Sequence, residues 1–427
     1  MAGARRRGQA DLTGAPDREL GQEICARIDR LAALSAELGR LTRVFLSPEQ
    51  KEAGVLVGAW MRDAGMTAHT DAIGNLVGRY EGDRPGLPAL MIGSHLDTVR
   101  DAGRYDGILG VVTAIACVER LHRAGARMPF AIEVVGFADE EGTRFGAPYL
   151  GSRAVAGTFD PALLELRDAS GMTMRQAMVH YGLDPAMISR AARAREELLA
   201  YVELHIEQGP VLERAGLAVG CVTGISGATR LSVRFSGHAG HAGTVPMTDR
   251  RDALAGAAEA VLAVERLCSG TPGLVGTVGM IEAAPGAINV IPGETRFSVD
   301  VRSPDDRVRE VTLGQFAAEA RAVAERRGLT VALDRLSDSK AAPCAPWLVA
   351  RIRDAIASEG IEVLELPSGA GHDAAAICAI ADIGMIFVRC ERGISHHPAE
   401  SITIADAEIG ARVLLAFIQA FSDQRGG

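Results

Sequence analysis

The segment 89–137 constrains the fold more than any other part of the sequence, because it predicts a strand, a helix and a second strand in that order. Residues 89–92 and 130–137 are apolar runs of strand length, and residues 108–124 carry apolar side chains at helical spacing. A strand–helix–strand unit of this length joins two parallel strands. We therefore predict an α/β fold built on a mixed, largely parallel sheet.

A chain of 427 residues is too long for one ordinary hydrophobic core, so we expect two domains. The segment 221–338 differs from its surroundings, because it predicts four strands, one of them over 273–280, and two helices. The pattern after it returns to that of the first part. We therefore predict one discontinuous domain, 1–220 with 339–427, and an inserted α+β domain, 221–338, that contains a four-stranded sheet and two helices.

Charge and cysteine usage restrict the partners and the compartment. The chain has 45 basic and 54 acidic residues, a formal charge of −9, which argues against general binding to nucleic acid or to anionic membranes. Its seven cysteines are scattered and include no CxxC pair, which favours a reducing, cytoplasmic location. No apolar run is long enough to span a membrane.

Potential metal ligands follow the two predicted strands of the 89–137 segment. His95 and Asp97 form an H-x-D motif, in which extended chain points both side chains the same way. An imidazole there can bind a metal while the carboxylate orients its other nitrogen. Glu140 and Glu141 end the second strand. Ligands of such sheets gather at the carboxyl ends of the strands, so these side chains are candidates for one site.

Three further candidates lie elsewhere: Asp106 before a predicted helix, His205 in an alternating stretch, and His396 in a loop framed by glycine and proline. Taken singly, each candidate has a structural explanation. Asp106 can cap a helix, a lone buried histidine is more often a core residue, and paired acids are typical of a solvated turn. Taken together, histidines with several acids at strand ends suit divalent ions of the Zn, Mn and Co class.

Nine short motifs then occur in order between about residues 90 and 400: GSHLDTV, RYDG, DEEGTRFG, HIEQGP, HAGTVPM, NVIPGE, DVR, SGAGHDA and GISHHPAE. Together they resemble the amidase/hydantoinase/carbamoylase branch of the M20-type metallopeptidases. That branch contains N-carbamoyl-L-amino-acid hydrolases, allantoate amidohydrolases and β-ureidopropionases. The resemblance covers most of the chain and implies that the insertion is a lid and dimerisation domain.

The resemblance implies two divalent metal ions per subunit, Zn or Mn, with Co or Ni as alternatives. Asp97 would orient a ligand, and Glu140 would be the general base and acid. Motif alignment favours His396 over His397 as a ligand. The implied metal ligands are His95 and His205 for one ion, Glu141 and His396 for the other, and Asp106 bridging both.

The resemblance also implies the substrate side of the site and a homodimer. His241 would reach the other subunit's site and steady the oxyanion, while Asn289 and Arg302 would bind the substrate carboxylate. A surface salt bridge is the plain alternative for Arg302, and helix-entry packing is that for His241. Gln208 would contact the carbamoyl end. Gly369 and Gly371 would present backbone N–H groups, or simply form a tight turn.

The predicted function is hydrolysis of the carbamoyl or ureido C–N bond of small-molecule acids, with allantoate and N-carbamoyl-L-amino acids as leading substrates and release of ammonia and carbon dioxide. An M20-type dipeptidase or N-acyl-amino-acid deacylase is the alternative within the enzymes, although HIEQGP and NVIPG argue against it. A non-catalytic binding protein of the same fold is the alternative from a different class. The complete ligand set and the intact Glu140 argue against that reading.

Overall fold

The computed structural model describes residues 18–421, which form two compact units. The first unit contains the described chain up to Thr223, together with Cys344–Leu366 and the chain from His372 onward. The second contains Gly224–Pro343 and Pro367–Gly371. The chain passes between them within β6 (Val219–Ile225), after β14 (Ala342–Pro343) and within β15 (Glu365–Ser368).

The first unit has a sheet whose centre is parallel. Its central order is β4-β3-β5-β16, and all three pairings are parallel. Antiparallel strands flank this centre, β2 and β1 on one side and β6 on the other. The predicted mixed, largely parallel sheet is therefore confirmed. The strands not yet bounded are β1 (Thr67–Thr70), β2 (Leu76–Tyr80), β3 (Ala89–His95), β4 (Ala131–Phe137), β5 (Leu198–Ile206) and β16 (Ile383–Val388).

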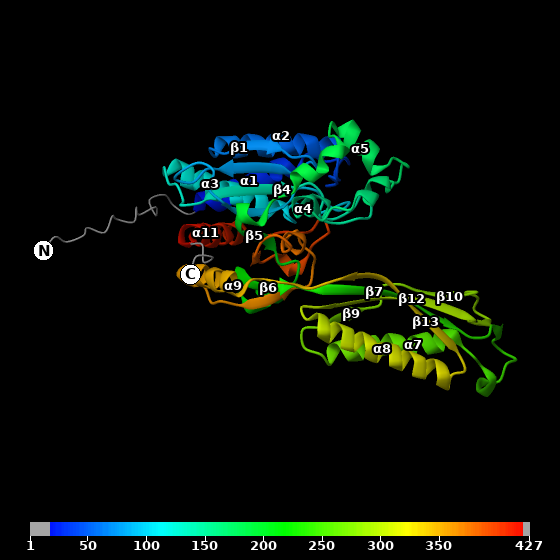
Figure 1. The fold of residues 1–427 in the computed structure, drawn as a ribbon. Coiled ribbons are helices and arrows are strands. Elements are labelled where there is room, and N and C mark those ends of the chain that lie inside the picture. The colour runs from blue at the N-terminus through cyan, green and yellow to red at the C-terminus, as the bar shows by residue number, and fades with distance from the viewer. Residues whose placement is uncertain (1–17, 422–427) are drawn as a thin grey trace. The chain divides into compact units, whose positions relative to one another are not determined.

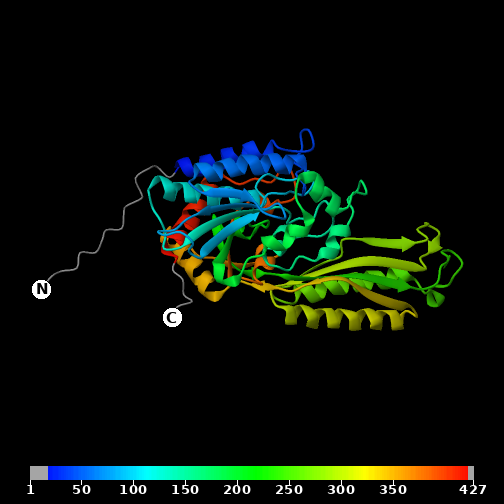
Figure 2. The same ribbon diagram turned by 45° about the horizontal axis from the view of Figure 1, so that its top comes forward.

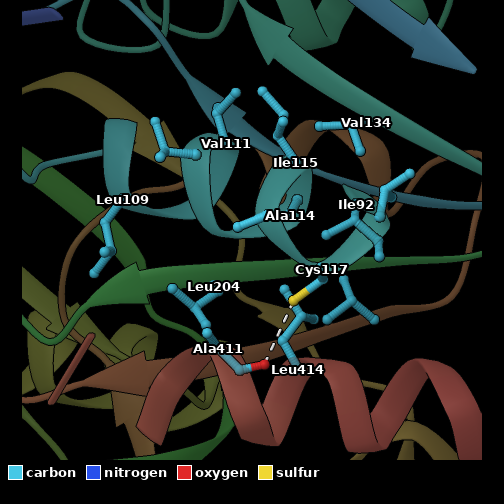
Figure 3. Close-up of a cluster of buried hydrophobic side chains, with 14 of the residues drawn as sticks. Ile92, Leu109, Val111, Ala114, Ile115, Cys117, Val134, Leu204, Ala411 and Leu414 are labelled. Atoms are coloured by element: carbon cyan, nitrogen blue, oxygen red, sulfur yellow. Dashed lines mark hydrogen bonds between the residues drawn. The ribbon is translucent and has the colours of Figure 1, made fainter. Parts of the chain in front are cut away.

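Five helices share one hydrophobic core with this sheet (Figure 1): α1 (Arg18–Ala32), α2 (Pro48–Asp63), α3 (Ile108–Arg123), α9 (Pro346–Ser358) and α11 (Ile404–Ala420). Figure 3 shows apolar side chains of α3, the strands and α11 meeting in this core. There the Cys117 thiol donates to the Ala411 carbonyl at 3.4 Å. All seven cysteines are free.

The alternation along β5 explains why the site lies on one face of the sheet. The even-numbered residues from Ala200 to Ile206 belong to the apolar core. Successive strand residues point to opposite faces, so the odd-numbered Tyr201, Glu203 and His205 lie on the other face. All three are buried. A polar, buried face next to the strand ends is the setting of the candidate site.

The short helix α10 (Ala374–Ile377) contacts β5 and β16, and α4 (Leu150–Val155) contacts α10. The other short helices, α5 (Met174–Tyr181) and α6 (Val211–Ala215), lie in the connections between strands. A smaller apolar cluster, which includes Phe45, Phe145 and Leu150, holds the 142–197 region together. No helix within residues 18–421 is both long enough and apolar enough to cross a bilayer.

The second unit is an antiparallel sheet with two helices on one face (Figures 1 and 2). The strand order is β10-β12-β7-β13, with β9 also paired to β12. The helices α7 (Ala253–Ser269) and α8 (Asp306–Arg326) share its core. A separate ribbon joins β8 (Gly240–His241) to β11 (Val290–Ile291). The sheet strands are β7 (Gly227–Ser236), β9 (Val275–Thr277), β10 (Ile281–Ala284), β12 (Glu294–Ser303) and β13 (Thr330–Ser339).

The predicted four-stranded sheet is wrong in strand number, because this sheet has five. The expected strand 273–280 contains β9 only, and β10 follows it from Ile281; both pair with β12, in registers that differ by one residue. Between them the Met280 N–H donates to the Ser298 hydroxyl at 3.1 Å, and the Ser298 N–H donates to the Met280 carbonyl at 3.0 Å. This local irregularity separates β10 from β9, and β10 is the strand that the sequence did not predict.

Candidate metal centre

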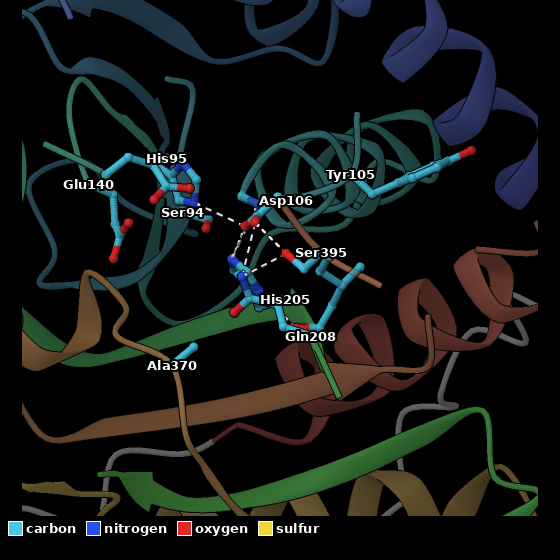
Figure 4. A network of polar contacts seen from close by, with 12 residues as sticks. Ser94, His95, Tyr105, Asp106, Glu140, His205, Gln208, Ala370 and Ser395 are labelled. Atoms are coloured by element: carbon cyan, nitrogen blue, oxygen red, sulfur yellow. Dashed lines mark hydrogen bonds and ion pairs between the residues drawn. The ribbon is translucent and has the colours of Figure 1, made fainter. Parts of the chain in front are cut away.

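Strand ends of the first unit bring the predicted ligands to one place (Figure 4). His95 is the last residue of β3, His205 the penultimate residue of β5, and Glu140 and Glu141 follow β4. These strands are parallel, so their carboxyl ends meet at the same edge of the sheet. Asp106 joins them just before α3.

The first group of potential ligands is His95, Asp106 and His205, whose ligand atoms all lie within 4.8 Å of one another. Asp106 Oδ1 lies 3.5 Å from His95 Nε2 and 3.1 Å from His205 Nε2. Gly107 follows with φ of +69°, and a side chain there would overlap the His95 ring. The group therefore requires glycine at this position.

The other ring nitrogen of each of these histidines is anchored on a backbone carbonyl. His95 Nδ1–H donates to the Asp97 carbonyl at 3.0 Å, and His205 Nδ1–H donates to the Ile206 carbonyl at 2.9 Å. Both Nε2 atoms consequently point at Asp106. This is the arrangement that fixes the tautomer of a metal-binding histidine.

The second group is Asp106, Glu141 and His396. His396 Nε2 lies 3.2 Å from Asp106 Oδ2 and 3.2 Å from Glu141 Oε1. His397 is absent from this group, and its Nδ1 accepts the Ala399 N–H at 3.1 Å. The two Asp106 oxygens therefore face two different sets of ligand atoms, as a carboxylate shared by two cations would.

The charges of these residues fit a cation. Hydrogen bonds that His396 donates to the Asp106 and Glu141 carboxylates raise its pKa to about 10. Burial alone would raise the pKa of Asp106, but hydrogen bonds with the three histidines hold it well below its usual range. A mixed set of imidazole and carboxylate donors suits Zn²⁺ or Mn²⁺.

Asp97 contacts three residues of this cluster and orients them. It is fully buried, and its two carboxylate oxygens accept the backbone N–H groups of Glu140 at 3.0 Å and Glu141 at 3.2 Å. Its Oδ1 is also 3.5 Å from His95 Nδ1. The Asp97 carboxylate therefore positions both the backbone that follows β4 and the imidazole at the end of β3.

Glu140 is 7% exposed and groups with His95 and Glu141. Burial raises its pKa well above the usual range, and repulsion from Glu141 adds to this, while His95 opposes it. A carboxylate with a raised pKa can both accept and return a proton near neutral pH. Its position next to a potential ligand, on a separate side chain, suits general acid–base chemistry.

Gln208 and Ser395 also reach Asp106. Gln208 has φ of +58°, and its Nε2 donates to Asp106 Oδ2 at 2.9 Å and to the Ser395 hydroxyl at 3.0 Å. Gln208 Oε1 is buried and forms no hydrogen bond with the described residues. The Ser395 hydroxyl donates to Asp106 Oδ2 at 2.8 Å. Sequence reasoning missed Ser395, although its place beside His396 is a signal.

Glu203 is a second residue that sequence reasoning missed. It is fully buried on β5 and accepts hydrogen bonds from the Ser94 hydroxyl at 2.8 Å, the Tyr201 hydroxyl at 3.1 Å and the Ala374 N–H at 3.1 Å. It also forms a potential ligand group with His205 and His372. An acid two residues before a histidine in a strand places both on one face, which is the signal that could have found it.

The predicted substrate-binding residues of the second unit form two pairs. His241 and Asn289 are exposed and adjoin through the β8–β11 ribbon, where the Ala242 N–H donates to the Asn289 carbonyl at 2.9 Å. Arg302 donates to both Asp300 oxygens, at 2.9 and 3.1 Å, and to the Gly369 carbonyl at 2.9 Å. Gly371 lies two residues beyond Gly369, in the same unit.

Comparisons with known proteins give a consistent result. The model of Peptidase family M20/M25/M40 matches residues 91–420. The chain is 41% identical to an N-carbamoyl-L-amino acid amidohydrolase of Geobacillus stearothermophilus over 92% of this chain and 97% of that protein. It is 40% identical to a probable allantoate deiminase of Oryza sativa subsp. japonica, over 93% of this chain and 88% of that protein. A solved amidase of the hydantoinase/carbamoylase family from Burkholderia multivorans has a TM-score of 0.87 and 34% identity, with 93% and 97% coverage.

Proposed function

The chain belongs to Peptidase family M20/M25/M40 and is a hydrolase of C–N bonds other than peptide bonds, and we propose that it cleaves the carbamoyl or ureido group of a small carboxylic acid with the help of two divalent ions. N-carbamoyl-L-amino acids and allantoate are the proposed substrates, because the named relatives act on them. The products are ammonia, carbon dioxide and the remaining amine. The observation that carries the proposal is Asp106, whose two oxygens face separate ligand groups.

The ligand set of the proposal follows these two groups. His95 and His205 would hold one ion and Glu141 and His396 the other, and Asp106, which belongs to both groups, would serve both. Zn²⁺ or Mn²⁺ is the proposed ion, with Co²⁺ or Ni²⁺ as alternatives, because imidazole and carboxylate donors accept all four. When bound, the ions polarise the scissile carbonyl and lower the pKa of water toward about 7.

Glu140 moves the proton in this proposal. It takes a proton from the attacking water as the oxygen bonds to the ureido carbon, and gives it to the nitrogen as the C–N bond breaks. Nitrogen leaves as ammonia, and the carbamate that remains loses carbon dioxide. Asp97 contributes by accepting the Glu140 N–H, which keeps this carboxylate beside the ligand Glu141.

The second unit supplies the proposed substrate contacts. The planar guanidinium of Arg302 already donates hydrogen bonds to both carboxylate oxygens of Asp300. A substrate carboxylate would compete for these donors or share them. Asn289 binds the same carboxylate, and Gly369 and Gly371 offer backbone N–H groups. Gln208 of the first unit turns its unpartnered Oε1 toward the carbamoyl nitrogen in this proposal.

A homodimer completes the proposal, with the second unit as lid and dimerisation domain and His241 acting in the other subunit's site. Exposed apolar residues of this unit support a protein interface: Met280 is 65% exposed, Ile281 49% and Ile288 104%. Ile281 lies on β10, an edge strand of the sheet. Apolar residues on an open strand edge favour association.

A substrate panel tests the proposal. Purified protein is loaded with Mn²⁺ or Zn²⁺ and given allantoate, N-carbamoyl-L-amino acids, an N-acetyl-amino acid and a dipeptide, while ammonia and amine release are followed. The expected result is ammonia from the carbamoyl or ureido substrates, together with about two metal ions per chain. Turnover restricted to the dipeptide or the acetyl compound would instead assign a dipeptidase or deacylase and reject the proposal.

A further inference from the structure

We propose that Glu400 is a positioning residue that keeps Asp106 and His396 close together, so that both can bind the same metal ion. The inference rests on the proposed dinuclear function. Glu400 is 3% exposed, and its Oε1 accepts the backbone N–H groups of Tyr105 at 2.7 Å and Asp106 at 3.0 Å. These partners lie 295 and 294 positions away in the sequence. One oxygen thus anchors the loop that presents Asp106.

The backbone of Glu400 anchors the other segment of the cluster. Its N–H donates to the His397 carbonyl at 3.0 Å and closes the turn directly after His396, a residue with φ of +56°. A non-glycine residue with this backbone angle is held by its surroundings. Glu400 therefore ties the Asp106 loop through its side chain and the His396 turn through its backbone. Between the two segments that Glu400 joins, His396 Nε2 and Asp106 Oδ2 lie 3.2 Å apart.

The Asp106 loop is shaped to receive this carboxylate. At Gly103 a Cβ atom would overlap the Glu400 carboxyl group, so the absence of a side chain there makes room for it. The second oxygen, Oε2, is buried and forms no hydrogen bond with residues 18–421. The contact with the loop therefore depends on one acceptor atom. That property makes glutamine, which keeps one acceptor oxygen, the conservative replacement.

Metal binding is sensitive to such a contact. Residues that orient a ligand typically change metal affinity by about 10- to 100-fold when they are removed. Loss of the Glu400 carboxylate frees the Asp106 loop, whereas the backbone hydrogen bond beside His396 stays, and His396 belongs to the second ligand group only. Weaker binding should therefore be confined chiefly to the second of the two ions.

Metal titration measures this directly and does not require turnover. Zn²⁺ binding to metal-free protein is followed by competition with a chromophoric chelator for the wild type, Glu400→Ala and Glu400→Gln, with thermal unfolding recorded alongside. The expected result is about 10- to 100-fold weaker binding of one ion in Glu400→Ala, and binding close to that of the wild type in Glu400→Gln. Equal loss in both variants, or no loss in Glu400→Ala, would overturn the inference.

A matched control separates positioning from general loss of stability. Asp406 is 2% exposed and lies six positions further along, where it pairs with Arg389 at 2.7 Å instead of contacting the ligand cluster. Asp406→Ala removes a buried acid of the same region and should leave Zn²⁺ affinity unchanged. An equal fall in affinity in this control would reject a specific role for Glu400.

The titration also distinguishes the inference from the proposed function. A wild-type protein that binds fewer than two ions contradicts the dinuclear proposal, whereas two ions in both the wild type and Glu400→Ala with equal affinity contradict only the role of Glu400. Should Glu400→Ala fail to fold, Glu400→Asp withdraws the acceptor by one methylene and keeps the charge. Weakened binding of one ion is again expected, and unchanged affinity again overturns the inference.

Discussion

The candidate metal cluster of the first unit and the proposed substrate-binding residues of the second are built in different ways. The cluster is mostly buried, and carboxylates distant in the sequence hold the backbone of two ligands: Glu400 accepts the Asp106 N–H and Asp97 the Glu141 N–H. His241 and Asn289 are exposed, and their polar contacts are local to one ribbon. Under the proposed function, this difference means that the metal ligands would be positioned within one unit, whereas substrate affinity would depend on exposed side chains.

Metal removal should produce the largest effect and tests the buried half of this comparison. Without ions, Asp106, Glu140 and Glu141 crowd together, so chelation should abolish turnover and lower stability. A ligand at about 1,000 times its dissociation constant stabilises by about 4 kcal/mol, which sets the scale of the expected loss. Thermal unfolding with and without chelator measures it, and added Mn²⁺ or Zn²⁺ should restore both properties. Equal melting temperatures would mean that the cluster does not bind the ions.

Glu140→Gln should have the next largest effect, because it removes the proton carrier and leaves the ligands in place. We expect kcat to fall by about 10²- to 10⁴-fold, the usual contribution of general acid–base catalysis, while metal content stays at the wild-type level. Steady-state kinetics with metal analysis of the same sample measures both. Asp406→Asn, which changes a buried acid that pairs with Arg389 and belongs to no ligand group, is the control. A fully active Glu140→Gln would assign the base to another residue.

The sequence could predict which residues meet in the first unit because strand ends carry that information. His95, Glu141 and His205 lie at or next to the ends of apolar strands, and parallel pairing brings those ends together. Glu400 could not be found in this way, because its contact with Tyr105 and Asp106 depends on tertiary packing across 294 or more positions. Sequence periodicity describes neighbours along the chain, not such distant partners.

The second unit was predicted less well for a related reason. Its helices and alternating strands have clear periodicity, and these parts match the structure. β10 begins at Ile281, just beyond the expected strand 273–280, and its separation from β9 depends on the Ser298 hydroxyl and on a register set by β12. The one-residue difference between the registers of β9 and β10 cannot be read from the hydrophobic pattern of the sequence. The expected count of four strands therefore failed there.

Arg302→Ala tests the exposed half of the comparison and should have an intermediate effect. Hydrogen bonds to a charged group contribute about 1.5–3 kcal/mol, so KM for carboxylate substrates should rise by about 10- to 100-fold with little change in kcat or metal content. Kinetics with a substrate and with its carboxamide analogue measures this. The variant should discriminate less between the two compounds. Arg230→Ala removes the other arginine that pairs with Asp300 and is the control.

Ser395→Ala should have the smallest effect and sharpens the comparison from within the cluster. Its hydroxyl donates to Asp106 Oδ2 at 2.8 Å, but Gln208 Nε2 donates to the same oxygen at 2.9 Å, so one donor remains after the substitution. A typical hydrogen bond contributes about 0.5–1.5 kcal/mol, which corresponds to roughly a 2- to 10-fold loss of metal affinity. Chelator competition resolves a change of this size. Because two donors hold Asp106 Oδ2, Ser395→Ala should also leave KM unchanged. A change in KM without a change in metal affinity would mean that Ser395 faces the substrate instead.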